Sequence, residues 1–203
     1  MASAMMSGGP RLQIRAPEPA SRFQFLTVPG LGGSGPQHWQ TFWQRDDPAM
    51  LRVEQRDWDR PEADEWSFAI ETAVRNAAKA AILIAHSCGV TAIAHWVHRY
   101  ETPIAGAFLV APPDWQRPGI EPAVRNFGPM PLDPLPFPAI VVASEDDPYC
   151  DLERARGFAS SWGASFVSAG KAGHINTASG HGPWPEGKRL LTAFATELFL
   201  RRK

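Results

Sequence analysis

Three residue types that together perform nucleophilic catalysis occur in one order along this chain: Ser87, then Asp147, then His174. A serine hydroxyl becomes a nucleophile when a histidine accepts its proton and an acidic side chain holds the imidazole. The order serine, acid, histidine is typical of hydrolases whose serine lies on a sharp strand-to-helix turn, and it differs from both serine-protease orders. The chain therefore carries a candidate triad for acyl chemistry.

Ser87 lies in the segment Ala85-His86-Ser87-Cys88-Gly89, between an apolar run and a helical pattern. A serine at the apex of such a turn needs small residues two positions before and after it, because larger side chains would collide. Ala85 and Gly89 meet this need, although alanine stands where glycine is more usual. From this segment alone, Ser87 could also serve only as a helix N-cap.

The acid and the base each have an alternative. Asp146 and Asp147 are adjacent after an apolar run, and successive side chains of an extended chain point to opposite sides. Only one of them can then face the histidine, and we favour Asp147, which precedes Pro148, over Asp146. His174 follows the last expected strand in a loop that can reach back over a sheet, whereas His181 lies in a Gly- and Pro-rich turn and is the second choice.

A glycine-rich segment, Pro29-Gly30-Leu31-Gly32-Gly33-Ser34-Gly35, follows the first expected strand. Glycines let the main chain approach a ligand closely. In a hydrolase with a serine turn, this loop and the residue after the serine each supply one backbone N–H to the oxyanion. We assign these donors to Leu31 and Cys88. The segment lacks the phosphate-binding glycine patterns, so the alternative is an ordinary flexible loop.

Several aromatic and histidine side chains near these segments are candidates for a substrate pocket. They are His38, Trp39, Trp58, His86 and Trp115. Core packing is the alternative for the tryptophans, and structural hydrogen bonding is the alternative for the histidines. His95 and His98 are three positions apart on an expected helix, but a metal site needs a third ligand, so we expect no metal and no cofactor. Cys88 is expected to be a small packed side chain.

Short apolar runs alternate with helical patterns along the chain. The expected strands are 23–28, 51–55, 80–85, 105–110, 139–143 and 165–168, and the expected helices are 38–45, 62–76, 90–100, 151–162 and 186–200. Strands without a polar face that alternate with helices predict an α/β fold with a mostly parallel central sheet covered by helices on both faces. Ligands bind at the carboxyl ends of such strands, which is where the three candidate catalytic residues fall.

The length of 203 residues fits one domain, which we place at 22–203. Residues 1–21 contain no apolar run that could act as a signal peptide, and we expect a disordered tail there. The segment 111–138, between the fourth and fifth strands, holds nine prolines in 28 residues. It is too short for a large cap domain, so we expect a stiff flap with a short helix around 121–127.

The composition excludes several kinds of partner. A formal net charge of −1 argues against binding to nucleic acid or to an anionic membrane surface. The sequence contains no apolar run of 18 residues or more that could cross a membrane, and two cysteines fit a reducing compartment, so we expect a cytoplasmic protein. A small-molecule substrate is expected, and a protein partner cannot be read from these patterns.

Four segments together resemble the small serine hydrolases of the retinoblastoma-binding protein nine and YdeN family. They are Pro29-Gly30-Leu31-Gly32-Gly33, Ala85-His86-Ser87-Cys88-Gly89, Ser144-Glu145-Asp146-Asp147-Pro148 and Gly173-His174, and His38-Trp39 and Asp57-Trp58-Asp59-Arg60-Pro61 are also similar. The resemblance covers about residues 23–200. It implies a minimal α/β-hydrolase domain without a large cap, with the triad on Ser87, Asp147 and His174, and it favours Asp147 over Asp146.

The resulting expectation is a serine hydrolase that cleaves small to medium carboxylic esters, or amides, through an acyl-enzyme intermediate. Two alternatives stay open. The first is a non-catalytic protein-binding module on a hydrolase fold, because one fold can host many functions. The second is an acyltransferase that passes the acyl group to a nucleophile other than water.

Overall fold

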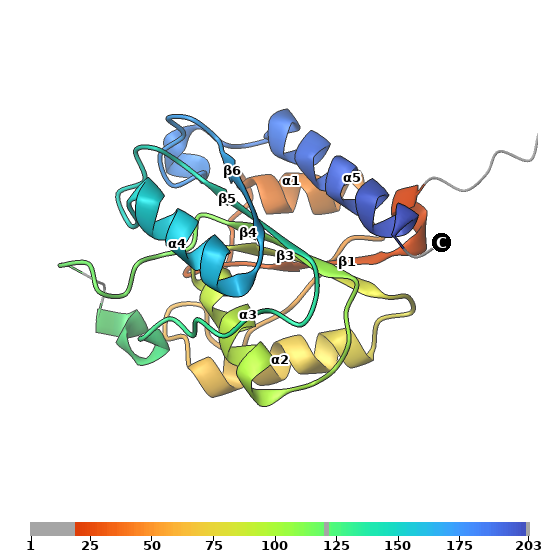
Figure 1. Ribbon diagram of the computed structural model, residues 1–203, viewed down its shortest axis with the longest axis horizontal. Helices are drawn as coiled ribbons and strands as arrows, with labels where there is room; N and C mark the ends of the chain where they lie inside the picture. Colours follow the sequence, from red (N-terminus) through yellow and green to blue (C-terminus); the bar gives the residue numbers. More distant parts are fainter. Residues whose placement is uncertain (1–18, 120–121, 202–203) are drawn as a thin grey trace, which may run out of the picture.

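A six-stranded parallel sheet forms the centre of the molecule (Figure 1). The computed structural model describes residues 19–119 and 122–201. The strands are β1 (Gln24–Val28), β2 (Leu51–Arg52), β3 (Ala81–His86), β4 (Gly106–Val110), β5 (Ala139–Ala143) and β6 (Ser165–Ser168), in the spatial order β2-β1-β3-β4-β5-β6. Every neighbouring pair is parallel, which confirms the predicted sheet.

Helices cover both faces of this sheet. One face carries α1 (Trp39–Asp46) and α5 (Pro185–Leu200), and the other carries α2 (Ala63–Arg75), α3 (Cys88–Arg99) and α4 (Leu152–Trp162) (Figure 1). Successive strand residues alternate between two cores, since Ile82 and Ile84 pack beneath α1 and α5 while Leu83 packs on the opposite side. The alternation explains why these strands have no polar face.

Strand β2 is shorter than the predicted run 51–55. It pairs with β1 only through Leu26 with Leu51 and Thr27 with Arg52, and the Val53 N–H adds one bond to the Thr27 carbonyl. Pro29 follows the end of β1 and has no N–H to offer, so the ladder cannot continue. The chain therefore leaves the sheet edge soon after Arg52.

The connection between β4 and β5 contains no large cap among its described residues. The one helical element among the described residues of this connection is η2, a 3₁₀ helix at Pro122–Phe127, which lies where the short helix was predicted. Phe127 anchors it, because its ring is fully buried and makes edge contacts with Trp66. The connection therefore adds a short flap to the domain.

Two further 3₁₀ helices flank the sheet. Helix η1 (Pro19–Arg22) precedes β1, and η3 (Thr177–Ser179) follows β6. Most of the predicted tail, residues 1–18, lies outside the described residues. Residues 19–21, the last three of the predicted tail, lie in η1.

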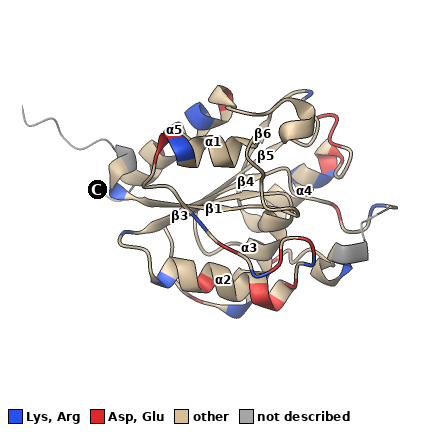
Figure 2. Cartoon of the chain, turned by 180° about the vertical axis from the view of Figure 1, so that it is seen from behind, with Lys and Arg blue, Asp and Glu red and all other residues tan. Residues whose placement is uncertain are grey.

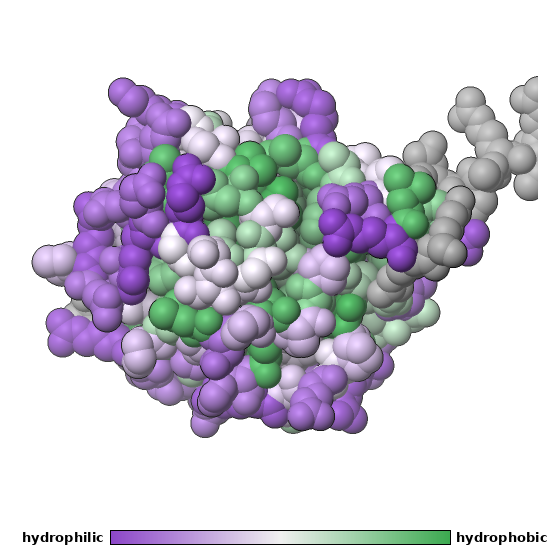
Figure 3. Space-filling model, viewed as in Figure 1, coloured by the Kyte–Doolittle hydropathy of each residue, from purple (hydrophilic) through white to green (hydrophobic). Residues whose placement is uncertain are grey.

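The surface carries both charge signs and a largely apolar region. Acidic and basic residues lie on helices and in loops, and neither sign dominates the view of Figure 2. Figure 3 shows apolar side chains gathered where the edge strand β6 meets α5, beside a cavity of about 630 Å³ lined by Val167 and Trp184. Within the described ranges, no helix is long and apolar enough to span a bilayer.

Candidate active site

Ser87 lies at the apex of the turn between β3 and α3. Its φ of 53° is uncommon for a residue with a side chain and marks a strained, tightly held backbone. The turn depends on Gly89, because a Cβ there would lie 2.2 Å from the Val28 carbonyl oxygen. Ala85 is fully buried in the sheet, and the turn forms with alanine at this position. The Ser87 side chain makes no capping hydrogen bond, so the N-cap alternative does not explain it.

Ser87, His174 and Asp147 form a continuous chain of hydrogen bonds. The Ser87 Oγ and His174 Nε2 atoms are 2.9 Å apart, and His174 Nδ1 lies 2.9 and 3.0 Å from the two carboxylate oxygens of Asp147. The histidine and the aspartate are both buried. The three residues follow β3, β5 and β6, so the carboxyl edge of the sheet brings them together from distant parts of the sequence.

This geometry suits proton transfer from the serine hydroxyl. The carboxylate accepts the Nδ1 proton, which leaves the lone pair of Nε2 directed to the hydroxyl. Asp147 also accepts the backbone N–H of Tyr149 at 2.9 Å, which fixes the orientation of its carboxylate. The Tyr149 ring packs edge-on against His174 with centroids 4.6 Å apart and forms one wall of the site.

Asp146 points elsewhere and supports the histidine loop. Its exposed carboxylate accepts the Ser144 hydroxyl and the Gly173 N–H, each at 2.7 Å. These two bonds lower the pKa of Asp146. Ser144 Oγ in turn accepts the Ala172 N–H at 2.9 Å, so the end of β5 is tied to the residues just before His174. This support was not predicted from the sequence, although the sequence does place a serine, Ser144, two positions before Asp146.

His86 holds the same loop from the other side. Its Nε2–H donates to the His174 carbonyl oxygen at 2.9 Å, and burial lowers the pKa of His86 well below its ordinary value. The His38 ring lies next to it, with centroids 4.7 Å apart, and burial together with the nearby Arg52 lowers the pKa of His38 to about 3. Two neutral imidazoles therefore lie in a row beside the His174 ring, and neither adds a positive charge.

The two backbone amides assigned to the oxyanion lie close to the serine. A Cβ on Gly30 would be 2.9 Å from Ser87 Cβ and 3.3 Å from the Cys88 nitrogen, so the loop after β1 packs directly on the turn. In the described part of the chain, neither the Leu31 nor the Cys88 N–H donates to a backbone carbonyl. Arg52 supports the loop by donating to the Gly33 carbonyl at 2.7 Å.

Cys88 behaves as a packed side chain. It is buried at the start of α3, and burial raises the pKa of its thiol. A thiol that stays protonated is a poor nucleophile, since the thiolate is the reactive form. The side chain of Cys88 therefore offers no competing nucleophile beside Ser87.

A cavity of about 340 Å³ opens over the hydrogen-bonded chain. The side chains and backbone that line it include Leu31, His38, His86, Ser87, Tyr149 and His174. His38 and His86, which the sequence indicated as pocket residues, thus line the same cavity as Ser87. The volume lies at the small end of the range for ligand pockets, about 300–1,000 Å³.

Two of the tryptophans expected in the pocket lie elsewhere. Trp39 is the first residue of α1 and is fully buried, and its indole N–H donates to the Ile175 carbonyl at 2.9 Å, so it is a core residue. Trp58 is half-buried against the glycine loop, and a Cβ on Gly33 would lie 2.9 Å from its indole. Trp58 therefore packs against the loop and is not among the residues that line the cavity over Ser87.

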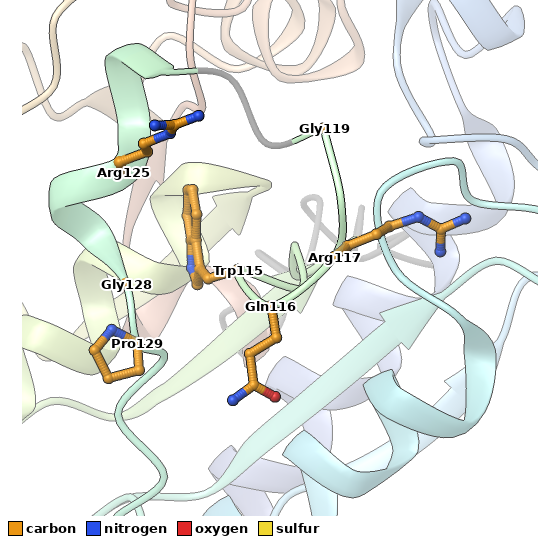
Figure 4. Close-up of a pocket in the computed structure, with 7 residues that line it drawn as sticks. All are labelled: Trp115, Gln116, Arg117, Gly119, Arg125, Gly128 and Pro129. Carbon is orange, nitrogen blue, oxygen red and sulfur yellow. The ribbon is translucent and has the colours of Figure 1, made fainter.

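Trp115 lines a different cavity, of about 450 Å³, formed by the β4–β5 connection (Figure 4). Its indole N–H donates to Thr91 Oγ1 at 3.0 Å, and its ring stacks on Phe127. Arg117 also borders this cavity, but its side chain points away from Trp115 and pairs with Asp151 at 2.7 Å. The prediction that Trp115 walls the pocket of the serine is corrected accordingly.

The remaining histidines lie outside the hydrogen-bond chain of Ser87, His174 and Asp147. His181 Nδ1 lies 3.0 Å from the Ser179 carbonyl, and His95 Nε2 donates to the Phe127 carbonyl at 2.7 Å. His98 is exposed near Asp133. Among residues 19–119 and 122–201, no group of three or more His, Cys, Asp or Glu side chains could hold a metal ion.

Comparison with known proteins places the chain in a family. The family model described as serine hydrolase matches residues 25–193. A YdeN-like hydrolase from Pectobacterium atrosepticum is 35% identical, with a TM-score of 0.80 over 89% of this chain and 95% of its own. The comparison with curated proteins gives no match.

More distant structures share the fold. The ydeN gene product of Bacillus subtilis is 17% identical, with a TM-score of 0.67 over 84% of this chain and 97% of its own. The apo form of esterase 2 from Thermogutta terrifontis is 17% identical, with a TM-score of 0.62 over 89% and 85%. The predicted resemblance is thereby confirmed, and the chain belongs to the serine hydrolase family, as a hydrolase with a minimal α/β-hydrolase fold.

Proposed function

We propose that this hydrolase cleaves small to medium carboxylic esters, with Ser87 as nucleophile, His174 as general base and acid, and Asp147 as the residue that orients the imidazole. The observation that carries the proposal is the unbroken hydrogen-bond chain from Ser87 Oγ through His174 to Asp147. A strained serine turn and two amides without a backbone acceptor lie beside it. These are the parts that acyl transfer requires.

The reaction proceeds in two halves. Ser87 Oγ attacks the ester carbonyl carbon while His174 Nε2 takes the hydroxyl proton, and the Leu31 and Cys88 amides stabilise the oxyanion. The imidazolium then protonates the departing alcohol, and the acyl group stays on Ser87. In the second half, His174 takes a proton from water, the hydroxide attacks the acyl-enzyme, and the carboxylic acid leaves as Ser87 recovers its proton.

The size of the site supports a small acyl group. The cavity of about 340 Å³ over Ser87 has no large cap above it among the described residues. The esterase from Thermogutta terrifontis has also been solved with butyrate bound, and it shares the fold of this chain. Short-chain esters are therefore the first substrates to test, and amides of the same size are the second.

The test is hydrolysis of p-nitrophenyl esters from acetate to octanoate by the native protein, by Ser87→Ala and by Ser160→Ala. Alanine at position 87 keeps the Cβ in the turn. Ser160 is an exposed serine on α4, so Ser160→Ala serves as the matched control. We expect kcat to fall by at least about 10⁴-fold in Ser87→Ala and to stay unchanged in Ser160→Ala.

Other outcomes separate the alternatives. Equal activity of native protein and Ser87→Ala would overturn the assignment of the nucleophile. Faster product release on addition of an alcohol, with a new ester formed, would favour an acyltransferase over a hydrolase. A native protein that hydrolyses none of these esters and does not react with a fluorophosphonate would favour the binding-module alternative.

A further inference from the structure

His38 carries a hydrogen-bond donor that the protein itself does not use. The residue is the N-cap of α1, and its Nδ1 accepts the Gln40 N–H at 3.3 Å. A ring nitrogen that accepts holds a lone pair, so in a neutral imidazole the proton must be on Nε2. Nε2 is buried and has no hydrogen-bond partner within the described chain. Such a buried, unpaired N–H is rare and needs an explanation.

The ring remains neutral under ordinary conditions. Burial is the main cause that lowers the pKa of His38 to about 3, and the Arg52 guanidinium adds to the effect. His38 therefore cannot exchange protons with a substrate near neutral pH. It offers a constant N–H in a positively biased environment, which favours a ligand atom with a lone pair.

The position of the ring connects this donor to the proposed reaction. His38 lines the same cavity as Ser87, His174 and Leu31. Its backbone N–H donates to the Gly35 carbonyl at 3.0 Å, which fixes it to the glycine loop. The nearest ring, that of His86, meets it edge-on at 4.7 Å without a hydrogen bond between them. The cavity that His38 lines is therefore a source of an acceptor, either a water molecule or the oxygen of a bound substrate.

We propose that His38 Nε2–H is a specificity-determining donor that binds a second oxygen of the ester, separate from the scissile carbonyl. The substrate class is then an ester with a hydroxyl, ether or keto oxygen within a few atoms of that carbonyl, on the acyl or on the alcohol side. The inference rests on the proposed function, because it takes Ser87 as the nucleophile. The scissile carbonyl oxygen itself is assigned to the Leu31 and Cys88 amides.

Two substitutions separate the two nitrogens of the ring. His38→Asn keeps an oxygen acceptor for the Gln40 N–H, since asparagine is a favourable N-cap, but removes the donor at the Nε2 position. His38→Gln keeps a terminal N–H donor of similar reach and loses the short capping acceptor. The exposed His98→Asn is the matched control, because it makes the same replacement away from the cavity.

The measurement compares esters that differ by one oxygen at equal size. The acyl pair is p-nitrophenyl methoxyacetate and p-nitrophenyl butyrate, and the alcohol pair is 2-methoxyethyl butyrate and n-butyl butyrate. For each pair, the ratio of the kcat/KM values of the two esters is compared between protein variants. The intrinsic reactivities of the two esters cancel in this comparison. We expect the oxygen preference in one pair to fall about tenfold in His38→Asn, and to be retained in His38→Gln and His98→Asn.

Each outcome decides the proposal. Loss of preference in the first pair assigns the oxygen to the acyl side, and loss in the second pair assigns it to the alcohol side. Unchanged ratios in both pairs would overturn the proposal, as would an equal slowing of all four esters by His38→Asn. If His38→Asn does not fold, a preference lost in the folded His38→Gln would overturn it. Failure of the proposed function is distinct, since either Ser87→Ala would then retain activity or the native protein would hydrolyse none of the esters.

Discussion

Asp146 and Asp147 are neighbours in sequence but act on opposite sides of one strand end. Asp147 is buried and bonds the His174 imidazole, whereas Asp146 is exposed and bonds Ser144 and the Gly173 N–H. Asp147 therefore holds the imidazole that we propose as the base, and Asp146 holds the backbone that carries this imidazole. Replacement of Asp147 and replacement of Asp146 should therefore have different effects on activity.

We predict that Asp147→Asn lowers kcat by about 10⁴-fold, because an amide in that position stabilises the wrong tautomer of His174 and cannot stabilise the imidazolium. Asp146→Asn keeps an oxygen acceptor for the Gly173 N–H and should cost about tenfold or less. Ester hydrolysis by both variants, with thermal unfolding as a check on folding, measures the difference. Equal losses in the two variants would contradict the assignment of the acid to Asp147.

Asp146 also gives a pH-dependent prediction. Its hydrogen bonds lower its pKa below the ordinary value of 3.8, so the native state favours the ionised form. This stabilisation is complete above the unfolded-state pKa and is lost as the pH falls through the lower pKa of the native state. The free energy of unfolding of native protein and Asp146→Asn, measured in urea from about pH 5 to about pH 3, should therefore converge on acidification. A constant difference would show that the charge of Asp146 does not matter.

At the scale of elements, α3 packs closely on the end of β1 at the site. Gly89, on the first turn of α3, would place a Cβ 2.2 Å from the Val28 carbonyl and 2.7 Å from that of Pro29. Gly157 on α4 is also a helical glycine, but nothing lies within 4 Å of its added Cβ. Alanine substitutions at Gly89 and Gly157 therefore separate the effect of close packing from the effect of helix propensity.

Gly89→Ala should push α3 away from β1 and disrupt the turn that holds Ser87, so we expect loss of activity and strong destabilisation. Gly157→Ala should stabilise the protein by about 1 kcal/mol, since alanine is the better helix former. Urea unfolding of both variants provides the test. A Gly89→Ala protein with native activity and stability would rule out the close packing of α3 on β1.

The elements were more predictable from the sequence than the contacts between them. The runs 80–85 and 139–143 predicted buried strands because a continuous apolar segment of that length fits a sheet covered on both sides. Trp39 was misassigned because its burial depends on Trp184, far along the chain, whose ring lies 5.1 Å away. The bond from His86 to the His174 carbonyl depends on the path of a loop, which no local pattern encodes.

At the scale of the whole molecule, the cavity over Ser87 is part of a domain with only a short flap in its β4–β5 connection. Helix η2 is its one helical element in the described chain, and it is anchored by Phe127 next to Trp115 rather than over Ser87. A helical lid that opens at a lipid surface therefore has no counterpart among the described residues.

We accordingly predict no interfacial activation. The rate of ester hydrolysis should follow a simple saturation curve as the substrate concentration crosses its solubility limit, because the site is already open. Tributyrin hydrolysis followed in a pH-stat, below and above saturation, measures this. A sharp rise in rate when droplets form would contradict an open site.

The most direct test of the triad is the chemical identity of the residue that reacts. A fluorophosphonate transfers its phosphonyl group to an activated serine with loss of fluoride, and tandem mass spectrometry of the digested protein locates the adduct. Our account predicts one adduct, on Ser87, which is absent in Ser87→Ala and slow to form in His174→Ala. An adduct on Cys88 or any other residue, or labelling that persists in Ser87→Ala, would contradict it.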